Sequence, residues 1–201
     1  MRKNVLPYSK YAQLPKTYFT HQIAISGATG VGTSTTVKNL KDRLDDPRWK
    51  SVSAGAIMRG FARERGIAIE ELAKYNRVHP EAGYDRRCDD ATRAEGLDDY
   101  RILEGRLAHV FAPKAFHVLL KCPGDVRALR RYGDDVYVSV NDGKKLINDR
   151  DTADNKRYAK LYPGCLWPES DFDLVLDTSK LSPGDVVQKI LTAHKKWEKL
   201  P

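Results

Sequence analysis

Short apolar runs alternate with segments of helical apolar spacing along most of this 201-residue chain. Residues 23–25 form the first run, and Val37, Leu40 and Leu44 follow at the spacing of one helix face. The later patterns predict strands at Val52 and at residues 100–103, 115–120 and 172–176, and helices at residues 57–65, 69–76 and 85–94. This alternation predicts an α/β fold in which helices cover both faces of a central parallel sheet, giving three layers.

The C-terminal part adds a terminal helix and a charged segment. Residues 183–185, Pro-Gly-Asp, predict the start of a helix whose apolar stripe, ending at Trp197, we interpret as core packing. Between residues 132 and 165 the chain is charged and poor in long apolar runs. Residues 136–143 place β-branched side chains before Asp-Gly, which predicts a strand entering a turn, and a polar helix is expected from about residue 145 to residue 161.

The composition limits the class of protein. The 35 Lys and Arg residues against 27 Asp and Glu give a net charge of +8, which suits an anionic partner such as nucleotide phosphates. Basic and aromatic residues do not interleave, so a nucleic-acid-binding module is disfavoured. No apolar run is long enough to span a bilayer, and the N-terminus lacks a secretory apolar core. Cys88, Cys122 and Cys165 are scattered without metal-ligand spacing, so we expect reduced thiols in a cytoplasmic protein.

A glycine-rich stretch lies between the first predicted strand and helix, Gly27-Ala28-Thr29-Gly30-Val31-Gly32-Thr33-Ser34-Thr35. A strand, a glycine turn and a helix start in this order form a phosphate-binding loop, where backbone N–H groups and the helix N-terminus bind an anion. Gly27, Gly32 and Ser34 match the usual spacing, but Thr33 stands at the position of the usual lysine. An active enzyme therefore needs other cations beside the phosphates. The alternative is a glycine turn that opens an ordinary helix.

The predicted polar helix carries Arg150 and Arg157. Because they are seven residues apart, the two arginines share a helix face. Because the chain also contains a predicted phosphate-binding loop, we interpret this helix as part of a mobile lid that brings arginines over the phosphates. A solvated charged helix is the alternative.

Five motifs follow one another between about residues 21 and 193. They are Gly27-x-x-Gly30-x-Gly32-Thr33-Ser34-Thr35, Val52-Ser53-Ala54-Gly55-Ala56-Ile57-Met58-Arg59, Ile102-Leu103-Glu104-Gly105-Arg106, Arg150-x-x-x-x-x-x-Arg157-Tyr158 and Asp173-Leu174-Val175-Leu176-Asp177-Thr178-Ser179. In order and spacing the chain resembles the cytidylate kinase family, particularly its short archaeal-like branch. Threonine commonly replaces the loop lysine in that branch, so Thr33 agrees with the resemblance.

The resemblance implies a P-loop nucleoside monophosphate kinase that transfers the γ-phosphoryl group of ATP to CMP, or to dCMP, with Mg²⁺. It implies a single kinase domain at residues 21–201, with a monophosphate-binding region at 53–97 and a lid region at 132–165. Residues 1–20 would form an N-terminal arm. The partners would be small-molecule substrates, and we expect a monomer. Such chemistry requires several arginines because two polyanions must be brought together.

The resemblance also implies roles for particular residues. The nucleotide-binding residues would be Gly27, Gly30, Gly32, Thr33, Ser34 and Thr35. Ser53 and Arg59 would address the acceptor, with Arg59 gripping its phosphate. Asp85, with Arg86 beside it, would accept a hydrogen bond from the exocyclic amine of cytosine, where uracil presents a carbonyl. The alternatives from the residues alone are a surface helix arginine for Arg59, which is the favoured interpretation of that residue by itself, and a helix-start cap for Asp85.

The remaining roles concern the metal and the transferred group. Ser34 and Glu104 would hold magnesium, with Glu104 acting through water. Arg106 would reach the acceptor phosphate and count among the catalytic residues, with Arg150 and Arg157 neutralising the transferred phosphoryl group. The alternative for Glu104 and Arg106 is a cap of the strand end.

Two other functions stay open. Residues 132–148 depart from the helical, acidic lid entry of the family, so the protein could be a kinase of the same fold for another small acceptor. From a different class, it could be a non-catalytic nucleotide- or RNA-binding protein, which the basic charge, the arm and the missing lysine favour. A salt-sensitive RNA complex without phosphoryl transfer would identify that second function.

Overall fold

The computed structural model describes residues 21–132 and 139–199, so the predicted arm at residues 1–20 lies outside the described part of the chain. The strands of the described residues are β1 (Gln22–Gly27), β2 (Lys50–Ser53), β3 (Arg101–Glu104), β4 (Phe116–Lys121) and β5 (Leu174–Asp177). The helices are α2 (Thr33–Leu44), α3 (Ala54–Glu64), α4 (Ile69–Val78), α5 (Tyr84–Glu95), α6 (Ala108–Phe111), α7 (Gly124–Tyr132), α8 (Val140–Leu161) and α9 (Pro183–Trp197), with short 3₁₀ turns η1 (Pro80–Ala82) and η2 (Glu169–Asp171).

The strands form one sheet in the order β2-β3-β1-β4-β5, and every neighbouring pair is parallel. β1 lies at the centre, where Ile23 pairs with Ile102 on one side and with Phe116 on the other. All six residues of β1 are buried, as expected of a parallel strand covered on both faces. The predicted parallel sheet is therefore confirmed.

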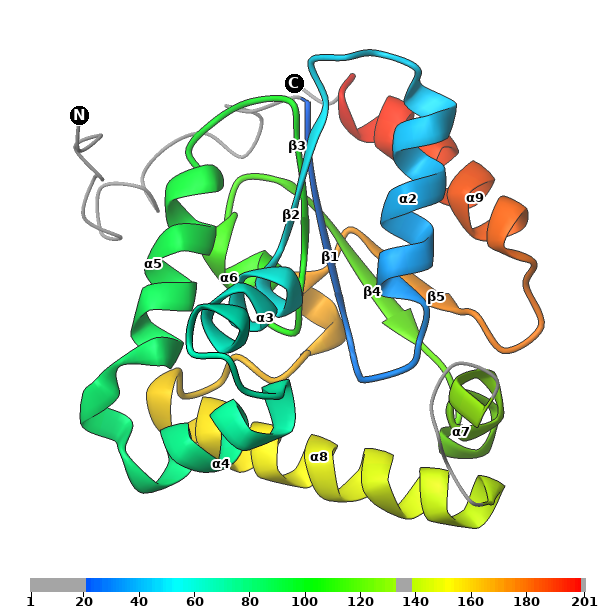
Figure 1. Cartoon of the computed structure of the whole chain (residues 1–201). Coiled ribbons are helices and arrows are strands. Elements are labelled where there is room, and N and C mark those ends of the chain that lie inside the picture. Colours follow the sequence, from blue (N-terminus) through cyan, green and yellow to red (C-terminus); the bar gives the residue numbers. More distant parts are fainter. Residues whose placement is uncertain (1–20, 133–138, 200–201) are drawn as a thin grey trace.

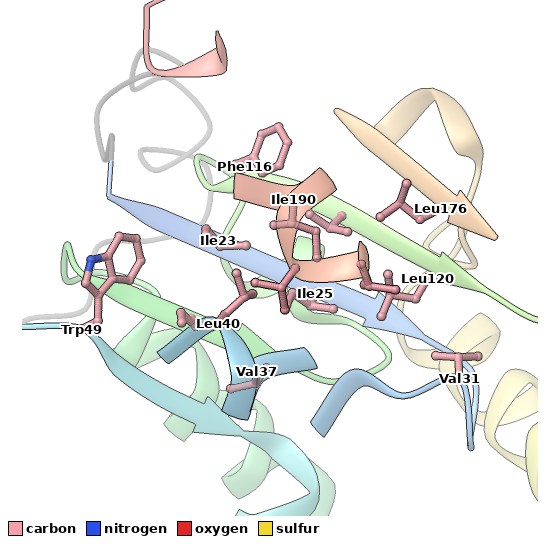
Figure 2. Close-up of a cluster of buried hydrophobic side chains, with 14 of the residues drawn as sticks. Ile23, Ile25, Val31, Val37, Leu40, Trp49, Phe116, Leu120, Leu176 and Ile190 are labelled. Atoms are coloured by element: carbon pink, nitrogen blue, oxygen red, sulfur yellow. The ribbon is translucent and has the colours of Figure 1, made fainter. Parts of the chain in front are cut away.

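Helices cover both faces of the sheet, which gives the three predicted layers (Figure 1). On one face Ile23 and Ile25 of β1 pack with Leu40 of α2 and Ile190 of α9 (Figure 2). All four side chains are fully buried. Ala24 points to the other face because side chains alternate along a strand, and it packs there with alanines of α6 and the segment after it. Burial of these apolar side chains is the main stabilising term of the fold.

The prediction for residues 136–143 is wrong from Val140 onward, while residues 136–138 lie outside the described part. Val140 begins α8, five residues before the expected helix start, and Gly143 lies inside the helix and not in a turn. The reason is local: the Ser139 hydroxyl accepts a hydrogen bond from the Asp142 N–H at 3.2 Å and caps the helix. The N-cap thus outweighs the β-propensity of Val140.

Two helices position the functional residues: α7, which the sequence pattern did not predict, and α8, which contains the predicted polar helix of residues 145–161. α7 follows β4 directly, and α8 packs along it, so both lie across the carboxyl ends of the central strands (Figure 1). Ligands of open α/β sheets bind at this edge. No helix of the described chain is both long and apolar enough to cross a membrane.

Candidate active site

The glycine-rich loop joins the carboxyl end of β1 to the first turn of α2 (Figure 1). Gly30 and Gly32 have φ angles of 81° and 99°, a region that glycine adopts without strain, and Gly32 is the N-cap of α2. At Gly27 a Cβ would lie 2.7 Å from Cγ2 of Val31 and 2.9 Å from the backbone oxygen of Leu120. The glycines therefore let the loop close tightly at a helix N-terminus, the arrangement that binds phosphate.

The side chains of the first helical turn bring a hydroxyl to the neighbouring strand. Thr33, Ser34 and Thr35 begin α2, and the Ser34 hydroxyl donates to Oε1 of Glu104 at 3.1 Å. Glu104 ends β3, which pairs with β1 in parallel, so its carboxylate reaches the sheet edge where the loop lies. The structure thus brings together Ser34 and Glu104, the two residues to which the resemblance assigns a magnesium role.

This pair fits the ligand preferences of a magnesium ion. Glu104 is only 7% exposed, and its Oε2 atom is buried without a hydrogen-bond partner. Mg²⁺ prefers oxygen ligands and binds through one or two protein oxygens together with water and substrate phosphates. The described residues contain no group of three or more His, Cys, Asp or Glu side chains that could hold a metal. A metal held by Ser34 and Glu104 would therefore take its other ligands from water and phosphate.

Arginines of α7 surround the loop that lacks a lysine. Nη1 of Arg127 donates to the backbone oxygen of Thr29 at 2.9 Å, and Nη1 of Arg130 donates to that of Val31 at 3.4 Å. Arg130 also donates to the backbone oxygen of Thr178 at 2.5 Å, which ties the loop to the end of β5. The sequence motifs did not identify these two arginines as functional residues. The signal in the sequence that could have identified them is a group of arginines directly after a buried strand, because that strand ends at the ligand-binding edge of the sheet.

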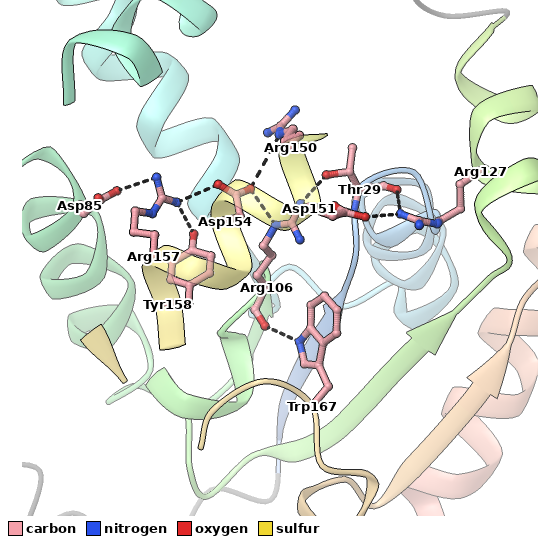
Figure 3. A network of polar contacts seen from close by, with 10 residues as sticks. All are labelled: Thr29, Asp85, Arg106, Arg127, Arg150, Asp151, Asp154, Arg157, Tyr158 and Trp167. Atoms are coloured by element: carbon pink, nitrogen blue, oxygen red, sulfur yellow. Dashed lines mark hydrogen bonds and ion pairs between the residues drawn. The ribbon is translucent and has the colours of Figure 1, made fainter. Parts of the chain in front are cut away.

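Arg106 lies beside the loop from the opposite side (Figure 3). Its Nη2 donates to the Thr29 hydroxyl at 2.6 Å and to Oδ1 of Asp151 at 2.5 Å, and its Nε is 3.0 Å from Oδ2 of Asp154. The indole N–H of Trp167 donates to the Arg106 backbone oxygen at 2.8 Å. The Arg106 side chain is 9% exposed, so these contacts are largely shielded from water.

Arg157 links α8 to the monophosphate-binding region that was predicted at 53–97. Its Nη1 is 3.5 Å from Oδ1 of Asp85 on α5, and its Nη2 is 3.2 Å from Oδ1 of Asp154. Burial acts to lower the pKa of Arg157, but the Tyr158 hydroxyl and the two carboxylates together raise it above its ordinary value. Arg157 is therefore a permanent cation at the centre of the contact between α5 and α8.

The other predicted residues differ in their exposure and in their contacts. Ser53 caps α3, with its hydroxyl accepting from the Ala56 N–H at 3.2 Å, and Arg59 is exposed on the same helix. The Arg86 side chain is 88% exposed and pairs with Asp90 at 3.8 Å on its own helix, so it does not join the cluster. Arg150 is also largely exposed, and its Nε is 3.9 Å from Asp154.

A second contact between α5 and α8 involves a perturbed carboxyl group. The Tyr162 hydroxyl at the end of α8 donates to Oδ2 of Asp89 at 2.5 Å. Burial raises the pKa of Asp89 to about 6, although the hydrogen bond from Tyr162 opposes the shift. Asp89 lies one helical turn after Asp85, so α5 and α8 are joined by two neighbouring polar contacts.

Fold and site together define a class of protein. Phosphoryl transfer requires a phosphate-binding loop, a metal site and cations around the phosphates. This structure has such a loop after the central strand, a Ser34–Glu104 pair suited to magnesium, and arginines that converge from α7, α8 and the end of β3. The class is that of the P-loop kinases.

The chain belongs to the cytidylate kinase-like family, whose profile matches residues 22–180. It is 36% identical over 165 residues to "Cytidylate kinase" of Pyrococcus abyssi, covering 82% of this chain and 88% of the relative. A "Cytidylate kinase" of Methanopyrus kandleri is 34% identical over 171 residues, covering 80% of this chain and 86% of the relative. The resemblance stated from the motifs is confirmed.

Solved structures of other kinases share the fold. Shikimate kinase from Acinetobacter baumannii in complex with shikimate superposes with a TM-score of 0.59 at 18% identity, covering 97% of this chain and all of that chain. A gluconokinase from Sinorhizobium meliloti superposes with a TM-score of 0.55 at 11% identity, covering 90% of this chain and 95% of that chain. At such identities the likeness establishes the architecture alone.

Proposed function

We propose that this protein is a cytidylate kinase, which transfers the γ-phosphoryl group of ATP to CMP and releases CDP and ADP. A phosphate oxygen of CMP forms a bond to the γ-phosphorus while the bond to the β,γ-bridging oxygen breaks, and that electron pair leaves with ADP. The observation that carries the proposal is the family match over residues 22–180, with relatives of that name aligned over most of both chains.

The donor half of the site would be the loop and its surroundings. Loop N–H groups between Gly27 and Gly32, at the N-terminus of α2, would bind the ATP phosphates. The Ser34 hydroxyl and the Glu104 carboxylate would hold Mg²⁺, which when bound supplies positive charge to the phosphate oxygens. Arg127 would provide the cation that Thr33 cannot, because its guanidinium already lies against the loop at Thr29.

The acceptor half would lie between α3, α5 and α8. Arg59 and Arg106 would bind the CMP phosphate, with Ser53 nearby at the start of α3. The Asp85 carboxylate would accept from the exocyclic amine of cytosine, which selects CMP over UMP because uracil offers no donor there. The same chemistry leaves dCMP as a second acceptor, since Asp85 addresses the base and not the sugar.

Arg150 and Arg157 of α8 would neutralise the transferred phosphoryl group. Both now pair with Asp154, and Arg157 also pairs with Asp85. These pairs must open when substrates bind, because a guanidinium donates fully to phosphate only when it releases competing carboxylates. We therefore propose that residues 132–165 act as a lid that rearranges during the cycle.

The remaining proposals concern the setting of the enzyme. We propose that the enzyme acts as a monomer. Cys88, Cys122 and Cys165 are free thiols, which supports a cytoplasmic location. Its partners would be nucleotides and not nucleic acid.

The reaction is tested by following the γ-phosphate itself. The purified protein is incubated with γ-³²P-ATP, CMP and Mg²⁺, and the nucleotides are separated by chromatography. We expect the label in CDP, and expect chelation of the metal to abolish the transfer. Label released only as inorganic phosphate, or no consumption of ATP, would contradict the proposal. A different phosphorylated product in a screen of small alcohols and acids would instead identify a kinase with another acceptor.

A further inference from the structure

A carboxylate of α8 occupies the place beside the phosphate-binding loop where anion donors converge (Figure 3). Oδ1 of Asp151 accepts from Nη2 of Arg106 at 2.5 Å and from the backbone N–H of Thr29 at 3.4 Å. Oδ2 of Asp151 accepts from Nη1 of Arg127 at 2.6 Å. We call these three donors, the Thr29 N–H and the guanidinium groups of Arg106 and Arg127, the anion site.

The anion site has the composition of a phosphate site. Loop N–H groups and arginines are the donors that bind phosphate oxygens, and guanidinium groups bind carboxylate and phosphate in the same geometry. The side chains of Arg106, Arg127 and Asp151 are 9%, 11% and 15% exposed, so the contacts are shielded from water. Burial alone would raise the pKa of Asp151, but the hydrogen bonds from the two arginines outweigh it and lower the pKa below its ordinary value. Asp151 is therefore an anion at neutral pH.

The carboxylate leaves part of the anion site unused. Nη1 of Arg106 and Nε of Arg127 are buried without a hydrogen-bond partner. A carboxylate offers two oxygens, whereas a terminal phosphate offers three and carries more charge, so a phosphate can satisfy more of these donors. A phosphate group thus has a physical advantage over Asp151 at the same position.

We propose that Asp151 is an internal substitute for phosphate, which occupies the anion site until the phosphates of the nucleotide displace it. This inference rests on the proposed function, because it takes the loop as the binding site for the ATP phosphates. Asp151 competes directly with the ligand, so weakly charged anions are excluded and only a polyphosphate binds well. Since Asp151 belongs to α8, its displacement also releases the lid helix from the loop.

The variant Asp151→Asn removes the competing charge and keeps the side-chain shape. We expect it to bind Mg²⁺-ATP and inorganic pyrophosphate about tenfold more tightly than the wild type by calorimetry, since charge-assisted hydrogen bonds of this kind are the strongest in proteins. The matched control is Asp149→Asn, the same charge change at an exposed position of α8, which should leave both affinities unchanged. Asp151→Glu keeps the charge and should bind no more tightly than the wild type.

Two readouts keep the test decisive where the variant is less stable. The rise in melting temperature caused by pyrophosphate should be larger for Asp151→Asn than for Asp149→Asn. In the wild type, pyrophosphate should speed amide hydrogen exchange around residues 148–154 of α8, because the ion pairs to the loop are lost. Equal or weaker binding by Asp151→Asn, or slower exchange in α8, would overturn the inference.

The outcomes also separate this inference from the proposed function. Tighter binding by Asp151→Asn together with no phosphorylation of CMP would support the inference and contradict the proposed acceptor. Absence of Mg²⁺-ATP and pyrophosphate binding in all variants and in the wild type would overturn both, because the loop would then not be a phosphate site.

Discussion

The guanidinium group of Arg157 lies 3.5 Å from the carboxylate of Asp85, so two residues with separate proposed roles in acceptor recognition and phosphoryl transfer are paired with each other. Binding of CMP would replace this contact by two others, with the cytosine amine at Asp85 and a phosphate oxygen at Arg157. The pair connects α5 with α8, and its opening would couple recognition of the base to movement of the lid. Different substitutions at the two positions should therefore affect different kinetic constants.

Replacement of Asp85 tests recognition of the base. Asp85→Asn keeps the side-chain size but removes the charge and places an amide donor near the base. We expect the ratio of kcat/KM for CMP to that for UMP to fall about tenfold, the effect of losing one charged hydrogen bond. The control is Asp90→Asn on the exposed side of the same helix. An unchanged ratio would remove Asp85 from the acceptor site.

Replacement of Arg157 tests its part in the transfer step. In Arg157→Ala we expect kcat to fall about 100-fold while the dissociation constant of Mg²⁺-ATP changes less than about threefold, because the arginine would stabilise charge that develops in the transition state. Lys156→Ala removes a neighbouring exposed cation and should retain the wild-type kcat. Normal turnover by Arg157→Ala would assign the residue to the α5–α8 contact alone.

The glycines of the fold should respond to alanine in opposite directions. Gly27→Ala places a Cβ 2.7 Å from Val31 and should lower the free energy of unfolding by about 1–3 kcal/mol. Gly32→Ala has open space, but its φ of 99° should cost about 1–2 kcal/mol. Gly60→Ala, with nothing within 4 Å inside α3, should raise stability by about 0.5–1 kcal/mol. Urea denaturation measures all three, and a stabilised Gly27→Ala would contradict the close packing of the loop.

Two buried groups should give opposing pH dependences of stability. The pKa of Asp89 is raised from 3.8 to about 6, so between these values the folded state holds a proton that the unfolded chain has lost, and stability falls as pH rises. Burial lowers the pKa of His109 from 6.5 to about 4, so there the unfolded chain holds the extra proton and stability rises with pH. Each shift of about two units corresponds to on the order of 3 kcal/mol.

Subtracting the wild-type curve from those of single variants isolates the two contributions. The free energy of unfolding of Asp89→Asn should increase relative to that of the wild type as pH rises from about 4 to 6, because the variant lacks the group whose titration lowers wild-type stability. In His109→Gln the rise in the free energy of unfolding that His109 contributes over the same pH interval should be absent, since the neutral amide does not titrate. Parallel curves for Asp89→Asn and the wild type would show that the pKa of Asp89 is not raised in solution.

Much of the fold followed from local patterns. The buried run before Gly27 and the alternation after it predicted β1 and the parallel sheet, because burial on both faces leaves a continuous apolar segment. The α8 start could not be predicted in this way, since the valine pattern favours a strand and the cap at Ser139 decides otherwise. The boundaries of β3 and β5 in the structure also differ from the predicted boundaries by one or two residues. At β3 the reason is that Tyr100 has a positive φ and therefore precedes the strand.

The site was predictable where a motif carries a residue to the sheet edge. Ser34 begins α2 just after the loop that follows β1, and Glu104 ends β3, which pairs with β1 in parallel, so the two side chains meet at the same edge of the sheet. Arg127 and Asp151 were missed because neither belongs to the quoted motifs as a functional residue, and their encounter depends on the packing of α7 against α8. Contacts between helices of this kind depend on tertiary geometry that sequence spacing does not encode.

The most direct measurement is ADP release by the purified protein with ATP and Mg²⁺ across CMP, dCMP, UMP, AMP and GMP, with Arg157→Ala prepared identically to exclude contaminating kinases. We predict turnover confined largely to CMP and dCMP, and a strong loss of that turnover in the variant. No turnover with any of the five acceptors, or equal turnover by the wild type and Arg157→Ala, would contradict the assignment of this protein as a cytidylate kinase.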